Sequence, residues 1–79
     1  MKRDKNKVEE IKKLRCSKGF FRKADMANMF EQHGIKMSRQ TYANKEYGIT
    51  KFTIDEMMVL AKVFEMGLED ACHFFNDMS

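Results

Sequence analysis

One stretch of the sequence, SRQTYANKEYG from Ser38 to Gly48, gathers side chains that bury poorly but hydrogen-bond well. Base edges in the major groove of DNA are read by such groups, because arginine suits guanine while glutamine and asparagine suit adenine. On a helix that enters the groove by its amino-terminal end, Arg39, Gln40 and, one turn later, Asn44 point roughly the same way. Composition alone favours the alternative, an ordinary polar surface helix.

The residue types that carry catalysis or bind metals do not form a comparable group. Neither Cys16 nor Cys72 belongs to a CxxC pair, and the dipeptide Cys72-His73 with the distant His33 has no recognisable metal-ligand spacing. The histidines and acids form no nucleophile–base arrangement. We therefore expect two reduced cysteines, no metal, no cofactor, no small-molecule ligand and no enzymatic activity.

Length and composition are those of one small globular domain. The 79 residues are 43% hydrophobic and 34% charged. A chain of this size buries only about 60–65% of its unfolded surface, which leaves little room for an enclosed catalytic cavity. No apolar run approaches the roughly 18 residues that cross a bilayer, and the amino-terminal MKRDKNKVEEIKK has no apolar signal region. We expect a single domain over residues 1–79, located in the cytoplasm.

Charge is distributed unevenly along the chain. Residues 1–51 hold 14 Lys and Arg against 6 Asp and Glu, a balance of +8, whereas residues 52–79 hold 1 lysine against 6 acids, a balance of −5. A basic front two-thirds suits a polyanionic partner. A solvated basic face explains the charge alone equally well.

Helical periodicity covers most of the chain, which contains no proline. A first helix is expected over Lys7–Lys18, with Val8, Ile11 and Leu14 on its apolar face and Gly19 as its stop, after a frayed basic arm at residues 1–6. A second helix is expected from Lys23 to His33. No residue before it is a good amino-terminal cap.

The later helices carry clearer start signals. Ser38 can cap a third helix that ends at Gly48, and Thr53 with Glu56 forms a capping box for a fourth. The expected inward positions of the fourth helix are Ile54, Met57, Leu60, Ala61 and Phe64. A fifth helix over Leu68–Phe75 should turn Leu68, Ala71 and Phe75 inward. The sequence thus predicts an all-α, compact five-helix bundle.

The stretch from Ser38 to Cys72 resembles the Cro/repressor-type (XRE-like) helix-turn-helix family of phage and bacterial regulators. Its residues are SRQTYANKEYG, then ITKF, then TIDEMMVLAKVFEMGLEDAC. The family pattern of a capping Ser or Thr, a polar pair, a Thr or Ser, an apolar residue, a later glutamate and a glycine is met by Ser38, Arg39, Gln40, Thr41, Tyr42, Glu46 and Gly48. The apolar stripe of the family's next helix is met by Met57, Leu60, Ala61 and Phe64. The resemblance implies a lambda-repressor-like fold with its helix-turn-helix at the second and third helices.

The sequence departs from this family in two places. Ten residues separate Ala27 from Ser38 where the family usually has five, so the second helix is longer or the turn, EQHGIKM, is expanded. Lys45 occupies a position that is usually apolar in the family. Its stem can cover the core while its ammonium reaches solvent or a phosphate.

The resemblance implies a role for particular residues. Base contacts are expected from Arg39, Gln40, Thr41 and Asn44, and contacts to the DNA backbone from Lys23, Ser38, Lys45 and Lys51. The glutamate after the family's recognition helix commonly pairs with an arginine late in the first helix, which here implies an ion pair between Arg15 and Glu46.

The implied function is sequence-specific regulation of transcription, as by a Cro-like repressor of phage or mobile-element origin in the bacterial nucleoid. Such a protein binds an approximately palindromic double-stranded operator as a homodimer, and Phe74-Phe75 is one candidate for the dimer surface. The alternative for this pair is one core and one merely exposed phenylalanine. The alternative function is an antitoxin or antirepressor that acts mainly through a protein partner.

Overall fold

A computed structural model describes residues 4–76 and contains five helices in that range. They are α1 (Lys5–Ser17), α2 (Lys23–Gln32), α3 (Arg39–Glu46), α4 (Ile54–Val63) and α5 (Leu68–Asn76). The described residues contain no β-strand, so the all-α prediction is confirmed. None of these helices combines the length and the apolar character that crossing a bilayer would require.

Three of the helices, α1, α3 and α4, begin where a side chain accepts a hydrogen bond from a backbone amide of the first turn. The Ser38 hydroxyl accepts from the Thr41 amide at 3.1 Å, and the Thr53 hydroxyl accepts from the Glu56 amide at 3.2 Å, as the sequence predicted. Asp4 caps α1 by accepting from the Asn6 amide at 2.8 Å. The expectation of a frayed arm is therefore wrong for residues 4–6, because an aspartate cap starts the helix two residues early; residues 1–3 lie outside the described range.

The first four helices, α1 to α4, end in a common hydrogen-bonded turn. After α2, the Ile35 amide donates to the Phe30 carbonyl and the Gly34 amide to the Glu31 carbonyl, both at 3.0 Å. This pair of bonds requires a left-handed residue, and Gly34 supplies it with φ of +84°. The turn after α4 has the same bonds but places Glu65, which is not a glycine, at φ of +56°.

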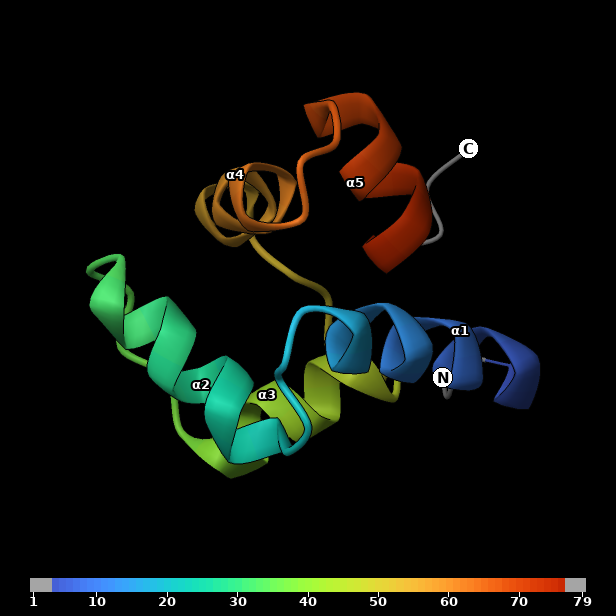
Figure 1. Ribbon diagram of the computed structural model, residues 1–79, viewed down its shortest axis with the longest axis horizontal. Helices are drawn as coiled ribbons and strands as arrows, with labels where there is room; N and C mark the ends of the chain where they lie inside the picture. The colour runs from blue at the N-terminus through green and yellow to red at the C-terminus, as the bar shows by residue number, and fades with distance from the viewer. Residues whose placement is uncertain (1–3, 77–79) are drawn as a thin grey trace.

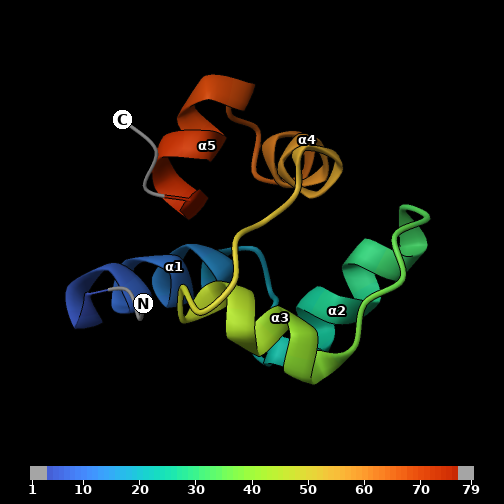
Figure 2. The same ribbon diagram turned by 180° about the vertical axis from the view of Figure 1, so that it is seen from behind.

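Figures 1 and 2 show the helices in two groups. One group contains α1, α2 and α3, with α2 packed on α3, and the other contains α4 packed on α5. The linker between α3 and α4, residues 47–53, runs from one group to the other (Figure 2). The resulting molecule measures 28 × 24 × 22 Å over its Cα atoms, with a radius of gyration of 11.2 Å.

Aromatic rings join the two groups. Phe52, in the linker, has its ring centroid 6.2 Å from that of Tyr42 in α3 and 5.7 Å from that of Phe75 in α5. It also stacks on Phe30 of α2 at 6.4 Å. Around these rings the core contains Ile11, Met26, Ala27, Met29, Met37, Met57, Leu60, Ala61, Phe64 and Ala71. The linker is thus anchored near its carboxyl-terminal end by a buried side chain.

Two expected core positions are instead exposed. Ile54 is 63% exposed and Leu68 is 43% exposed. Each is the first residue of its helix, where the chain has only begun to turn onto the core, and Phe52 fills the interior place ahead of α4. Helical spacing predicted that both residues are buried. It identifies the apolar face of a helix, but it does not show which part of that face other helices cover.

The Phe74-Phe75 pair does not form an exposed patch. Phe75 is a core residue with 1% exposure, and Phe74 is half-buried against it with ring centroids 5.1 Å apart. The Lys7 ammonium lies over the Phe74 ring, 4.1 Å from its centroid. This arrangement corrects the suggestion that both phenylalanines serve as a dimer surface. The two cysteines, Cys16 and Cys72, are free thiols and half-buried.

Candidate nucleic-acid interface

The solvent-facing side of α3 carries the side chains expected to read DNA. Arg39, Gln40 and Thr41 are exposed in the first turn, and Asn44 is half-buried one turn later. The Gln40 amide nitrogen donates to the Asn44 side-chain oxygen at 3.0 Å, and this bond joins the two amides into one unit. The Ser38 hydroxyl donates to the Thr41 hydroxyl at 2.9 Å, so the start of the helix is ordered as well as capped.

The opposite side of α3 is buried and includes charged residues. Glu46 is 1% exposed, and its Oε1 accepts from Arg15 Nε at 2.9 Å and from the Tyr42 hydroxyl at 2.8 Å. Arg15, itself 3% exposed, also donates through Nη1 to the Phe20 carbonyl at 3.0 Å. The ion pair that the family resemblance implied is therefore present, and it joins α1 to the last turn of α3.

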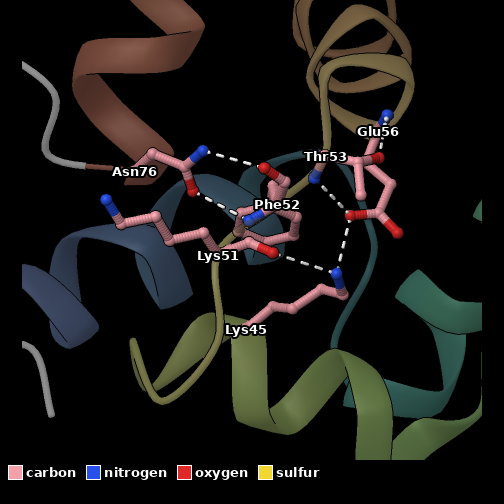
Figure 3. Close-up of polar contacts among 6 residues, drawn as sticks. All are labelled: Lys45, Lys51, Phe52, Thr53, Glu56 and Asn76. Carbon is pink, nitrogen blue, oxygen red and sulfur yellow. Dashed lines mark hydrogen bonds and ion pairs between the residues drawn. The ribbon is translucent and has the colours of Figure 1, made fainter. Parts of the chain in front are cut away.

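Lys45 lies where an apolar residue was expected, and the structure uses it differently from the prediction. It is 8% exposed, and its Nζ lies 2.8 Å from Glu56 Oε1 and 3.0 Å from the Lys51 carbonyl (Figure 3). The ammonium is enclosed and bonded to α4 and to the linker, and it would have to leave these partners to make the expected contact with a DNA phosphate. A buried charge needs such partners, since an unpaired one is strongly unfavourable.

The other expected phosphate contacts lie nearer to solvent. Ser38 and Lys51 are exposed residues that flank α3 in the chain. Lys23 begins α2, has a side chain that is 22% exposed, and places its Nζ 5.0 Å from the Tyr47 ring centroid and 3.9 Å from Glu46 Oε2. Its ammonium therefore already contacts the end of α3 and would have to be shared with a phosphate.

Glu56 has two roles at this site, and the sequence predicted only the first of them. It completes the capping box of α4, since its Oε1 accepts from the Thr53 amide at 2.8 Å. The same oxygen accepts from Lys45, eleven positions earlier in the chain. A lysine at a position expected to be buried needs a nearby carboxylate. The capping glutamate just beyond the linker is the feature of the sequence from which this pair could have been predicted.

The arrangement gives α3 two distinct sides. Its consecutive residues Lys45 and Glu46 form ion pairs with α4 and α1 respectively, and the described residues contain no buried side-chain nitrogen or oxygen without a hydrogen-bond partner. The exposed side presents a guanidinium, two linked amides and a hydroxyl. Such a surface can make hydrogen bonds to a polar partner while the helix beneath it stays fixed.

Comparisons of the chain with protein-family models, with curated protein sequences and with solved structures find no match.

Proposed function

We propose that this protein is a sequence-specific DNA-binding regulator of transcription, and that it reads the major groove with the exposed side of α3. The observation that carries the proposal is that α3 has two different sides, one exposed and polar and the other buried and held by ion pairs. Arg39, Gln40 and Thr41 face solvent, whereas the ion pairs of Lys45 and Glu46 hold the other side in the fold. A recognition helix needs this combination, because base contacts require side chains held in a fixed geometry.

The chemistry of the exposed side suits base edges. Arg39 can donate two parallel hydrogen bonds to guanine. The bond between Gln40 and Asn44 uses one Gln40 hydrogen and the Asn44 oxygen. The linked pair thus offers the Gln40 oxygen as an acceptor and the Asn44 amide group as a donor, which is the complement of the adenine edge.

We further propose that α2, the connection at residues 33–38 and α3 act as a lambda-repressor-like helix-turn-helix, with a Cro-like repressor as the nearest functional type. The packing of α2 on α3 supports this arrangement, as does the capped start of α3. The extra spacing between Ala27 and Ser38 is taken up partly by α2, which continues to Gln32, and partly by the connection that follows it. Lys23, Ser38 and Lys51 are the candidates for holding the DNA backbone.

The test is an electrophoretic mobility shift titration with the intergenic DNA upstream of the protein's own gene. The wild-type protein should form a complex that resists random competitor DNA at moderate salt. Arg39→Ala should lose about 1–3 kcal/mol on this DNA and little on random DNA, because it removes a base contact. Lys51→Ala is the matched control and should weaken both DNAs alike, with a slope of log K against log salt reduced by about 0.9.

Two outcomes would contradict the proposal. One is a wild-type protein whose complex is removed equally by random competitor. The other is an Arg39→Ala variant that loses both DNAs in the same proportion as Lys51→Ala, which would show that α3 is not the reading element.

A protein-binding role, as in an antitoxin or antirepressor, is the second candidate. It is favoured by Ile54 and Met58, which are 63% and 55% exposed and lie one turn apart on α4, in the acidic part of the chain. The same titration separates the two candidates, because a protein that acts mainly through this surface would give no tight, competitor-resistant complex with DNA.

A further inference from the structure

Three helices hold the backbone of three consecutive linker residues, 51–53 (Figure 3). From α3, Lys45 Nζ donates to the Lys51 carbonyl at 3.0 Å. From α5, the Asn76 side chain accepts from the Phe52 amide at 2.9 Å and donates to the Phe52 carbonyl at 3.0 Å. From α4, Glu56 accepts from the Thr53 amide at 2.8 Å. We call the side chains of Lys45, Glu56 and Asn76 the linker clasp.

The clasp binds a segment that has no regular structure of its own. Residues 47–53 belong to no helix or strand, and Gly48 near their start has φ of +81°. Backbone groups in such a segment need partners when they lie near the core. Here the partners are side chains from helices of both groups, so the path of the linker depends on how α3, α4 and α5 are placed.

Stability alone does not explain why a buried lysine and glutamate serve this purpose. An apolar pair of similar size at such a position is often as stable as a buried ion pair, or more stable. An apolar pair cannot, however, make the directional bonds from Lys45 to the Lys51 carbonyl and from Glu56 to the Thr53 amide. The distinguishing effect of the charged pair is therefore to fix where the linker backbone runs.

The residue fixed most directly is Lys51. Its carbonyl is held by Lys45, while the residue itself is exposed and is one of the proposed phosphate contacts. Lys45 belongs to α3, the proposed reading helix, so one side chain sets the distance between the reading side of α3 and a phosphate contact in the linker.

We propose that Lys45 is a positioning residue for DNA recognition, which acts through the linker clasp to hold Lys51 in register with the base-reading side chains of α3. This inference rests on the proposed function. It assigns Lys45 no contact with DNA. When Lys51 is already held in place, less conformational entropy is lost on binding. The affinity for cognate DNA rises more than that for random DNA, because cognate binding needs base and phosphate contacts together.

The test compares the wild-type protein with the double variant Lys45→Met/Glu56→Gln. Methionine keeps the length of the lysine stem, and the glutamine oxygen can still accept from the Thr53 amide, so the variant removes both charges together. Val63→Ala, a truncation of a half-buried residue of α4 away from the clasp, is the control for lost stability. All three proteins are measured at a temperature at which circular dichroism shows them fully folded.

Two measurements are made on each protein. Nitrogen-15 relaxation of the free protein should show lower order at the amides of residues 49–51 in the double variant, because the bond to the Lys51 carbonyl is lost. Order there should be unchanged in Val63→Ala. In the mobility shift titration, cognate affinity of the double variant should fall about tenfold, the equivalent of ordering about one backbone residue at binding. Random-DNA affinity should change by less than about twofold, because the charge of Lys51 is retained.

The outcomes separate this inference from the proposed function. A wild-type protein that does not prefer cognate DNA overturns the proposed function. If the wild-type protein discriminates but the double variant keeps the same cognate-to-random ratio, or keeps an ordered linker, the role of Lys45 is overturned while the proposed function stands.

Discussion

At the residue scale, Lys45 and Glu46 are neighbours in the chain but form ion pairs with different helices. Lys45 pairs with Glu56 of α4, and Glu46 pairs with Arg15 of α1. Because successive residues on a helix are rotated by about 100°, adjacent side chains can reach different neighbours. Two ion pairs from one helical turn thus fix α3 to α1 within its own group and to α4 of the other group.

Removal of the arginine partner should be costly. Arg15→Met leaves Glu46 at 1% exposure with its main cationic partner gone, and loss of one member of a buried pair costs about 3–5 kcal/mol. That is a large share of the stability of a small domain. Urea unfolding followed by circular dichroism measures the loss, with an osmolyte added to all samples so that the variant stays folded at zero urea.

The matched control is Lys18→Met, which removes an exposed pair with Glu65 at 3.9 Å. Exposed pairs contribute about 0–1 kcal/mol, so this variant should unfold close to the wild-type midpoint. If the two variants lose the same stability, the Arg15–Glu46 pair does not brace α1 against α3.

At the element scale, the sequence predicted the helix boundaries best where a side chain or a glycine sets them locally. Ser38, Thr53, Gly19 and Gly48 all marked real ends, because a cap or a left-handed turn depends on only a few neighbouring residues. The sequence failed where the outcome depends on distant contacts. The burial of Lys45 required Glu56 and the linker to arrive beside it, and helical spacing contains no information about that meeting.

The turn after α4 gives a prediction about element ends. Glu65 holds a left-handed conformation, φ of +56°, which costs a residue with a Cβ atom about 1–2 kcal/mol relative to the right-handed one. Glu65→Gly should therefore raise the free energy of unfolding by up to about 1 kcal/mol, since glycine also has more freedom to lose on folding. The urea midpoint of unfolding measures the change.

Glu65→Ala is the control for this substitution. It removes the carboxylate but keeps a Cβ atom, so it should leave the midpoint near or below the wild-type value. Equal stabilisation by glycine and by alanine would attribute the effect to the lost charge rather than to the backbone conformation.

At the scale of the whole molecule, the sequence predicted a five-helix all-α fold, but it did not show how the two groups of helices meet. That meeting depends on Phe52, whose ring contacts Tyr42 on one side and Phe75 on the other, and on the polar bonds around it. From the sequence alone, Phe52 could equally be a hydrophobic staple, which packs only against the first turn of α4. Only its placement between the groups shows its larger part in the fold.

The size of the molecule bears on the homodimer that the family resemblance implies. A two-fold pair that reads adjacent major grooves on one side of DNA must hold its reading helices about 34 Å apart, one turn of the double helix. Two copies in contact, each 28 × 24 × 22 Å over Cα atoms, are of the right size for that spacing. With Phe75 in the core, Ile54, Met58 and Leu68, which are exposed large apolar residues of α4 and α5, are instead candidates for pairing.

The operator should then contain two half-sites with centres about ten base pairs apart. Insertion of five base pairs between them places the half-sites on opposite faces of the DNA, so a dimer can engage only one of them, and affinity should fall to that of an isolated half-site. The same five base pairs inserted outside the footprint change neither half-site nor spacing and should leave affinity unaltered. Mobility shift titration of the three duplexes measures the difference. An isolated half-site that binds as tightly as the full operator would contradict the homodimer and leave a monomer with one reading helix.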